Sequence, residues 1–569
     1  MNKRAVILAT TILCGFAFVV MRLADLMLIN HERLAAQARL QHLGKKEIGL
    51  RRGAIVDRRG RPLAVNVDVE SAFFNPREAD DPAKAVPVIA EAASLDRAAL
   101  ARKLSSDKGF VWVERKLSPQ KAERLRSLKV KGLGFVPELK RVYPKGPMAA
   151  HVVGSVGIDN QPLEGLELAY NKHLKGKPAS VLFEKDAGGR PLSDGEDYET
   201  GGNSLVLTID EGLQFIVEKA LDNAVTRWEA PAATAIMMNP FTGEILALAN
   251  RPAYDPNDPS SSTAADRRNR AITDLYEPGS TFKLVMAAGA IEEKVVKPGD
   301  TFDASKGYIV VGRRAIWDVH NHGVLTFKEV IQASSNVGAI MVGERLGKEK
   351  LYEYAKRFGF GEKTGIDLPG ESSGTLKPLK QWSGTTLAAM SIGYEVAVTP
   401  LQVLRAYSAV ANGGYLVEPY VVSRIISPEG QTIWSHRSDL MVRAISERTA
   451  ETLKDMLVSV TEKGGTASEA SIDGNSVAGK TGTAKLIDRE SGGYSKKKYM
   501  SSFVGFVPAD DPRVAVIVVV REPKGRYYGG LVAAPVFREI ADRTMAYLGV
   551  PREDSFKENV LVVGARELR

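Results

Sequence analysis

The sequence predicts a membrane-anchored α+β protein, and three observations support this fold class. The chain has 569 residues, which is too long for one ordinary domain. Its apolar content of 44% and charged content of 25% are those of a globular protein. A long helical section, residues 280–463, is preceded by a hairpin and followed by three strand-like segments. We therefore expect an antiparallel sheet packed between helices.

The N-terminus carries a candidate membrane helix. Residues 5–21 contain no charged side chain and are marginally long enough to span a bilayer, and residues 23–29 extend this run past Arg22 and Asp25. A cleaved signal peptide is the alternative, but no small-x-small cleavage site directly follows the run. We expect a retained anchor over 5–29, with residues 1–4 on one side of the membrane and the rest of the chain on the other.

The net charge indicates which partners suit the chain, and the cysteine count limits its disulfide bonds. The net charge of +9 suits an anionic neighbour such as a membrane, a wall polymer or nucleic acid. The sequence carries no zinc-finger spacing, aromatic RNA-binding pattern or Arg-rich arm, so we expect no nucleic-acid partner. The single cysteine, Cys14, rules out a disulfide within the chain.

The region before residue 200 is expected to be a docking or spacing domain, because it brings no acid, base and nucleophile together. Apolar alternation around a Gly-Arg-Pro turn predicts a hairpin over 51–65. Helix-like periodicity predicts an amphipathic helix over 31–46 and small helices over 80–128. We assign residues 30–200 to this β-rich pedestal domain.

The region after residue 200 predicts a second domain over 201–550, followed by a charged tail at 551–569. A Gly-containing loop joins two strands into a hairpin at 232–249. A tight Pro-containing link at 508–512 makes the last two strands antiparallel. The other expected elements are a strand at 204–210, a helix at 212–228, strands at 476–485, 501–507 and 514–521, and a closing helix at 532–548.

The stretch from Glu277 to Lys283 is the strongest candidate for a nucleophilic site. Pro278 and Gly279 interrupt the chain, and an apolar helix is expected from Ser280 onward. A helix N-terminus favours negative charge, and Lys283 lies one turn after Ser280 on the same face. A lysine desolvated by apolar neighbours can act as the base for a serine hydroxyl. A structural helix cap at Ser280 is the alternative interpretation.

The Ser-x-x-Lys pattern alone does not identify the site, because it occurs four times. The matches begin at Ser105, Ser118, Ser280 and Ser495. Three of these serines lie among charged and polar residues typical of solvated surface, and only Ser280 opens an apolar helix. The flanking sequence therefore favours Ser280.

A second motif, Ser334-Ser335-Asn336, is the only Ser-x-Asn in the sequence. It lies between two predicted helices, where a hydroxyl and an amide can face a cleft and relay a proton. A helix cap is the alternative interpretation of these residues.

A third motif, Lys-Thr-Gly, occurs at Lys363 and at Lys480. The first copy falls in a loop without a strand partner. The second, Lys480-Thr481-Gly482-Thr483, lies in a predicted strand, so Lys480 and Gly482 share one face. Gly482 permits a substrate backbone to come close, and Lys480 can hold a carboxylate.

Asp318, His320 and His322 form a weaker candidate site. They could share one face of an extended segment and bind a metal. No further ligand cluster accompanies them, so a polar loop near the cleft is the preferred interpretation. We expect neither a metal nor a cofactor.

Taken in order, Ser-x-x-Lys, Ser-x-Asn and Lys-Thr-Gly resemble the signature of penicillin-binding proteins and serine β-lactamases. The stretches 52–58, 164–167, 527–530 and 533–537 make the chain similar to class B penicillin-binding proteins. The Tyr-Tyr-Gly-Gly block at 527–530 and the run 482–485 look more like the division (FtsI) branch than the elongation branch.

The resemblance implies a penicillin-binding transpeptidase fold and a role for each matched residue. Ser280 would attack the carbonyl of a D-Ala-D-Ala stem peptide and release D-Ala, with Lys283 as general base. Ser334 and Asn336 would relay the proton and hold the peptide. The carboxylate of the peptide would bind Lys480 together with Thr481, Gly482 and Thr483. The backbone N–H groups of Ser280 and Thr483 would form the oxyanion hole.

The resemblance also implies partners and a location. The substrates would be peptidoglycan stem peptides as donors and amine acceptors, and β-lactams would acylate the same serine. A SEDS-type (FtsW-like) glycosyltransferase and other division proteins would be partners. The bulk of the chain would lie in the periplasm, anchored in the inner membrane, with residues 1–4 in the cytoplasm. An elongation-type protein, or a penicillin-binding scaffold or sensor without turnover, remains the alternative.

Overall fold

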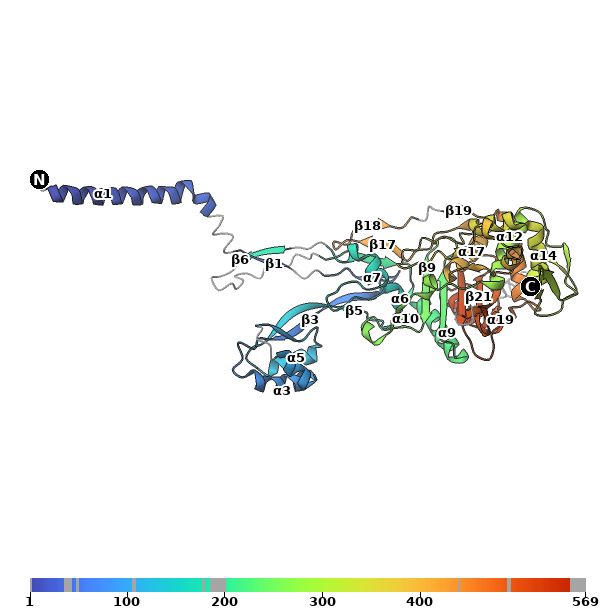
Figure 1. The fold of residues 1–569 in the computed structure, drawn as a ribbon, viewed down its shortest axis with the longest axis horizontal. Helices are drawn as coiled ribbons and strands as arrows, with labels where there is room; N and C mark the ends of the chain where they lie inside the picture. The colour runs from blue at the N-terminus through green and yellow to red at the C-terminus, as the bar shows by residue number, and fades with distance from the viewer. Residues whose placement is uncertain are drawn as a thin grey trace, which may run out of the picture. The chain divides into compact units, whose positions relative to one another are not determined.

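The computed structural model describes residues 3–34, 43–47, 51–104, 109–176, 180–184, 201–437, 441–488 and 493–552. The chain forms two compact units. One contains residues 1–52 and 175–202, and the other contains residues 53–174 and 203–569. Figure 1 labels several elements of each unit.

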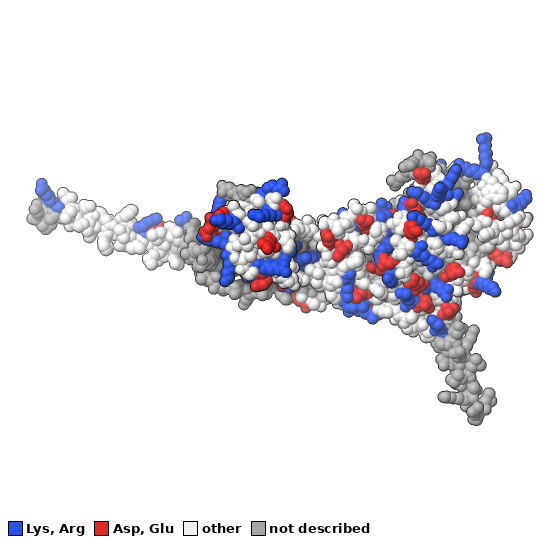
Figure 2. Space-filling model, turned by 90° about the horizontal axis from the view of Figure 1, so that it is seen from below, with Lys and Arg blue, Asp and Glu red and all other residues white. Residues whose placement is uncertain are grey.

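The first unit begins with the expected apolar helix. Helix α1 spans Lys3–Ala24 and continues as a π-helical turn, η1, over Asp25–Ile29. Within the described part of the chain, Val6–Ile29 is the one helical segment long and apolar enough to cross a membrane. Figure 2 shows this helix as a rod that is uncharged along most of its length.

A short strand pair in the first unit replaces part of an expected helix. Strand β1, Leu43–Glu47, pairs antiparallel with β6, Ser180–Glu184. The prediction of a helix over 31–46 is therefore wrong at its C-terminal end, while residues 35–42 lie outside the described residues. Pairing with a strand far away in the sequence decides this structure, and local periodicity does not report such pairing.

The second unit contains two large sheets, and the first joins segments from before and after residue 200. Its strand order is β18-β17-β7-β2-β3-β4, and β5 also pairs with β3. Neighbouring strands are antiparallel except β2 and β7, which are parallel. The hairpin expected over 51–65 is confirmed as β2–β3. The strands are β2 (Ile55–Val56), β3 (Pro62–Phe74), β4 (Val111–Glu114), β5 (Leu133–Val142), β7 (Ser204–Leu207), β17 (Val422–Ile426) and β18 (Thr432–Ser435).

A small lobe lies at one end of this sheet and has its own core. Phe74, Ile89 and Leu125 are fully buried in it. The small helices expected over 80–128 are confirmed. They are α3 (Pro82–Ala93), α4 (Arg97–Leu104) and α5 (Pro119–Ser127).

The second sheet is antiparallel throughout, with strand order β20-β21-β22-β8-β9. Residues 514–520 of β22 are all buried, which requires cover on both faces. Helices α9 (Glu211–Trp228) and α20 (Ala534–Leu548) pack together on one face, and α17 (Pro400–Ala411) covers the other. The strands are β8 (Ala232–Met238), β9 (Ile245–Arg251), β20 (Ala478–Asp488), β21 (Gly493–Val507) and β22 (Val514–Arg521). The expected antiparallel sheet between helices is confirmed.

The section between β9 and β20 is mainly helical, as expected, but it also holds four short strand pairs. Its longer helices are α12 (Lys283–Glu292), α13 (Phe327–Gln332), α14 (Asn336–Leu346), α15 (Lys348–Arg357), α16 (Thr386–Ser391) and α18 (Glu447–Thr461). The pairs are β10 (Thr301–Asp303) with β13 (Val324–Thr326), β11 (Tyr308–Val311) with β12 (Arg314–Trp317), β14 (Thr375–Leu376) with β15 (Val396–Ala397), and β16 (Tyr415–Leu416) with β19 (Val442–Arg443). The same section begins with the short helices α10 (Ala264–Arg267) and α11 (Arg270–Thr273). Short helices elsewhere are α6 (Ala150–Val153), α7 (Gly165–Ala169), α8 (Asn171–Leu174) and α19 (Gly529–Val532).

Candidate active site

Ser280 lies on a 3-10 turn that leads directly into a buried helix. The turn, η3, spans Gly279–Phe282, and α12 starts at Lys283. The N–H of Lys283 donates to the carbonyl of Ser280, which closes the turn. Gly279 adopts a φ of +55°, and its N–H donates to the carbonyl of Gly393 at 3.1 Å. The Pro-Gly break therefore reverses the chain so that Ser280 stands just before α12.

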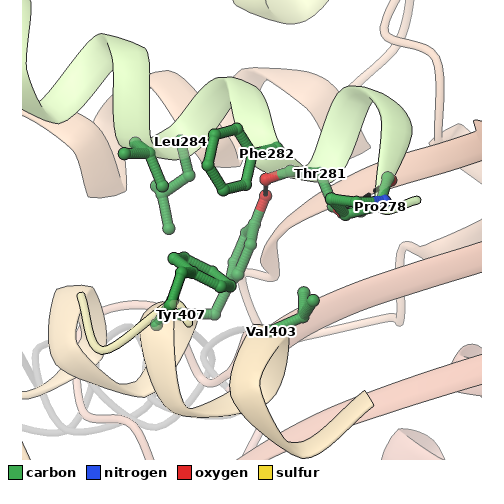
Figure 3. Close-up of a pocket in the computed structure, with 9 residues that line it drawn as sticks. Pro278, Thr281, Phe282, Leu284, Val403 and Tyr407 are labelled. Carbon is green, nitrogen blue, oxygen red and sulfur yellow. Dashed lines mark hydrogen bonds between the residues drawn. The ribbon is translucent and has the colours of Figure 1, made fainter. Parts of the chain in front are cut away.

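The turn is supported from beneath by the protein core. Tyr407 on α17 donates its hydroxyl hydrogen to the carbonyl of Thr281 at 2.9 Å. Figure 3 shows this bond beside a small apolar pocket whose walls include Phe282, Leu284 and Val403. Because Phe282 and Tyr407 are each only 1% exposed, the pocket belongs to the packing that fixes the turn.

The amine of Lys283 is fully buried and bonded to the Ser-x-Asn motif. Its Nζ donates to the carbonyl of Ser334 at 2.6 Å, to the carbonyl of Ser335 at 3.1 Å and to Oδ1 of Asn336 at 2.9 Å. The Ser334 hydroxyl lies 3.4 Å from the same nitrogen. Two motifs that are far apart in the sequence thus meet at one amine.

Lys480 reaches the same point from the edge strand β20. Its Nζ donates to the Ser334 hydroxyl at 2.8 Å. The side chain is 1% exposed. The Ser334 hydroxyl therefore lies between the amines of Lys283 and Lys480, which connects all three motifs through hydrogen bonds.

Burial changes the protonation of both lysines. A small cavity beside them has apolar walls that include Leu284, Ile331 and Leu457. This desolvation lowers the pKa of Lys283 to about 7, while the negative charge of Asp318 acts to raise it. Burial first, and then the charge of Lys283, hold the pKa of Lys480 well below its usual value. A neutral amine that can accept a proton is therefore available at Lys283 near neutral pH.

The Ser334–Asn336 segment is a strained turn between α13 and α14. Ser334 adopts a φ of +58°, which is uncommon for a residue other than glycine. Ser335 caps α14, because its hydroxyl accepts from the N–H of Gly338 at 3.0 Å. The middle residue thus has the structural role that was the alternative interpretation, while Ser334 and Asn336 face Lys283.

The Lys480–Thr483 segment packs directly against the Ser280 turn. A Cβ added to Gly482 would lie 2.9 Å from the carbonyl oxygen of Pro278. A Cβ added to Gly279 would lie 3.1 Å from the carbonyl oxygen of Thr483. Gly482 therefore permits the close approach of the Pro278 carbonyl within the chain, as well as that of a substrate. This contact places the nucleophile turn beside the edge of the sheet.

The two threonines of this motif have partners of their own. The Thr483 hydroxyl accepts from the N–H of Gly529 at 3.0 Å, and the Thr481 hydroxyl lies 3.4 Å from that of Thr466. The Tyr-Tyr-Gly-Gly block is thereby held against β20. The oxyanion-hole role of Ser280 and Thr483 stays a prediction.

The competing motif copies lie elsewhere and have ordinary structural roles. Ser118 caps α5 by accepting from the N–H of Lys121, and the Ser495 hydroxyl accepts from the N–H of Lys498. Ser105 lies outside the described residues. In the loop copy of Lys-Thr-Gly, Thr364 binds the carboxylate of Glu371.

Asp318 belongs to the segment that the sequence placed in a polar loop near the cleft, with a metal site as the weaker alternative. Asp318, considered above as a metal ligand, binds the N-terminus of α14 through its carboxylate, and its partners include Ser335 and Val337. Among the described residues, no group of three or more His, Cys, Asp or Glu side chains could hold a metal. Its contact with the Ser-x-Asn turn was missed, because strand β13 and helix α13 separate Asp318 from its partners along the chain.

Comparison with known proteins gives two family matches along the chain. The model of the "Penicillin binding protein transpeptidase domain" matches residues 233–542, and that of the "Penicillin-binding Protein dimerisation domain" matches residues 47–207. The chain is a class B penicillin-binding protein.

Similar class B proteins align with almost the whole chain. Stage V sporulation protein D of Bacillus subtilis is 37% identical over 555 residues, covering 95% of this chain and 85% of that protein. The peptidoglycan D,D-transpeptidase FtsI of Escherichia coli K12 is 34% identical over 572 residues, covering 99% and 93%. The crystal structure of penicillin-binding protein 3 from Mycobacterium tuberculosis, complexed with aztreonam, matches with a TM-score of 0.70 at 29% identity, covering 89% and 98%.

Proposed function

We propose that this class B penicillin-binding protein cross-links peptidoglycan through an acyl-enzyme on Ser280. The observation that carries the proposal is that the amines of Lys283 and Lys480 both lie within hydrogen-bond distance of the Ser334 hydroxyl, directly beside the Ser280 turn. The relative FtsI, which is named a peptidoglycan D,D-transpeptidase, supports peptidoglycan as the substrate.

In the acylation step, the Ser280 hydroxyl oxygen bonds to the carbonyl carbon of the penultimate D-Ala of a stem peptide. The hydroxyl proton passes to the neutral amine of Lys283, which its lowered pKa favours. The peptide C–N bond then breaks, and the departing D-Ala amine takes a proton through Ser334, which lies between the two lysines. The product is an ester between Ser280 and the shortened peptide.

In the second step, the amine of another stem peptide attacks the ester carbonyl. The amine loses a proton to the same Lys283–Ser334 pair, the C–O bond breaks, and Ser280 regains its hydroxyl hydrogen. Backbone N–H groups of Ser280 and Thr483 stabilise the oxyanion in both steps, at about 3 kcal/mol for each donor. Lys480 and Thr483 are proposed to bind the carboxylate of the donor peptide.

The chain is further proposed to act at the division septum, anchored in the inner membrane by residues 5–29. The similarity to FtsI over 99% of this chain supports this role, as does the Tyr-Tyr-Gly-Gly block. A SEDS-type glycosyltransferase and other division proteins are the proposed partners. The pedestal is assigned to 30–200 and the transpeptidase domain to 201–550, which the two family matches support. Depletion in the source cell should cause filamentation, whereas rounding would indicate an elongation role.

Mass spectrometry tests the chemistry. The purified chain is incubated with benzylpenicillin and digested, and the peptide that carries the penicilloyl group is sequenced. We expect the group on Ser280, and no adduct in Ser280→Ala at an unchanged melting temperature. Ser495→Ala is a matched control, because it removes the serine of a surface Ser-x-x-Lys copy. An adduct on another residue would overturn the proposal.

A further inference from the structure

The carboxylate of Asp318 is bonded to the turn that carries the Ser-x-Asn motif. Asp318 directly follows β12. Its Oδ2 accepts from the Ser335 hydroxyl at 2.7 Å, and its Oδ1 accepts from the N–H of Val337 at 3.1 Å. The N–H of Asn336 donates to the same Oδ1. Three donors of one turn therefore converge on a single side chain, at a helix N-terminus that favours negative charge.

The neighbouring residue adds a second bond to the same turn. The carbonyl of Trp317 accepts from Nδ2 of Asn336 at 3.1 Å. The amide of Asn336 is thereby oriented with its Oδ1 toward Lys283, from which it accepts at 2.9 Å. The segment 317–318 thus fixes both the backbone and the side chain of Asn336.

This turn needs such support, because it is strained. Ser334 holds a positive φ of 58° without being a glycine, and such a backbone persists only where the surrounding contacts enforce it. The strained conformation places the carbonyl and hydroxyl oxygens of Ser334 against the Lys283 amine. Without the carboxylate, the backbone N–H groups of Asn336 and Val337 would lose their partner.

We propose that Asp318 is a positioning residue of the transpeptidase, which holds the Ser334–Asn336 turn in the conformation that orients Lys283. The proposal rests on the roles of Ser280 and Lys283 proposed above. The negative charge of Asp318 acts to raise the pKa of the Lys283 amine, and Lys283 in turn lowers the pKa of Lys480. Asp318 therefore also supplies the negative charge that opposes the effect of burial on the Lys283 amine.

Two variants of Asp318 separate the two effects. In Asp318→Asn the amide oxygen can still accept from both backbone N–H groups, because one carboxylate oxygen takes both bonds. This variant removes the charge and keeps the turn. In Asp318→Ala all three bonds are lost. Asp303→Asn is the matched control. Asp303 is an exposed residue at the end of the short strand β10, and it binds Ser305.

The measurement is the rate of acylation by a fluorescent penicillin from about pH 5 to about pH 9 in the full-length protein. We expect Asp318→Asn to move the acidic limb of the rate profile to lower pH, because the lost charge favoured the protonated amine. We expect Asp318→Ala to slow acylation about 10-fold to 100-fold at every pH, since a misplaced group is costly. Asp303→Asn should match the parent protein.

The proposal fails if Asp318→Asn leaves the pH profile unchanged and Asp318→Ala acylates at the parent rate. If Asp318→Ala does not fold, Asp318→Glu decides instead. It keeps the charge but displaces the carboxylate from the turn, so acylation at the parent rate would overturn the positioning role. Adduct mapping in the parent protein keeps the two proposals distinguishable. An adduct on Ser280 with unchanged Asp318 variants overturns only the positioning role, whereas an adduct elsewhere overturns the proposed function.

Discussion

Gly482 and Pro278 lie so close that a Cβ at residue 482 would come within 2.9 Å of the Pro278 carbonyl oxygen. The same Cβ would lie 3.0 Å from Cγ2 of Thr281. The edge strand and the nucleophile turn therefore fit against each other only because residue 482 has no side chain. This contact joins two of the three sequence motifs by packing, independently of their hydrogen bonds.

In Gly482→Ala the added Cβ would meet the Ser502 hydroxyl on β21 first and then the Pro278 carbonyl, so the substitution should strain the contact between β20 and the Ser280 turn. We expect a loss of about 1–3 kcal/mol in the free energy of unfolding, because overpacking a tight contact strains its surroundings. Acylation by penicillin should fall as well. Thermal unfolding and a stopped-flow acylation assay measure the two effects. Gly493→Ala is the control, since its added Cβ meets nothing within 4 Å. Parent-like values for Gly482→Ala would contradict the importance of this contact.

The acylation rate should depend on the protonation of Lys283. Its pKa is lowered to about 7 by burial, so the amine is neutral above that pH and charged below it. We expect the rate to fall as the pH drops through about 7, because only the neutral amine accepts the Ser280 proton. Lys283→Arg, which stays charged, should slow acylation about 10²-fold to 10⁴-fold. A rate that is flat across this pH range would exclude Lys283 as the base.

Lys480→Met should separate activity from stability. The side chain is buried and its pKa is held low, so its amine contributes little to folding and a methionine of similar length fits the same space. We expect the melting temperature to stay the same or rise, while acylation slows because Ser334 loses a donor at 2.8 Å. Lys498→Met, on the exposed part of β21, is the surface control. A large drop in melting temperature would make Lys480 a structural residue instead.

Tyr494→Phe should weaken the contact between the β20–β21 hairpin and the residue that precedes the Pro-Gly break. The Tyr494 hydroxyl, near the end of the β20–β21 hairpin, donates to Oε1 of Glu277 at 3.0 Å, and Glu277 directly precedes the Pro-Gly break. The same oxygen accepts from the N–H of Glu395 at 2.8 Å. We expect weaker penicillin binding with a small change in the maximal acylation rate, measured by varying the penicillin concentration. An unchanged dependence of the acylation rate on penicillin concentration would show that the Tyr494–Glu277 bond does not affect penicillin binding.

Much of the fold follows from local sequence. The uninterrupted apolar run at 514–520 predicts a buried central strand, and β22 is buried there throughout. The hairpins at 51–65 and 232–249 carry turn residues that fix them, and both form. The expectation fails at Leu43–Lys46, where pairing with β6 replaces a helix. Local periodicity describes the faces of an element, but it contains no information about a partner strand far away.

The candidate site was predictable to a similar degree. The flanking sequence selected one Ser-x-x-Lys of four and one Lys-Thr-Gly of two, and hydrogen bonds join the selected Lys283 and Lys480 through Ser334. Asp318 was not assigned to this cluster, because carboxylates that support a turn carry no spacing motif. The sequence indicated that Gly482 lets a substrate come close. In the structure Gly482 also lets the Pro278 carbonyl come close.

The sheet that holds β7 between β2 and β17 has a practical consequence. A fragment cut at residue 201 would keep β7 but lose β2, and the strand would then offer a bare backbone edge to other molecules. A soluble catalytic fragment should therefore retain residues 53–174. When the pedestals of two relatives are exchanged, the chimera should fold best if β2 and β7 come from the same protein.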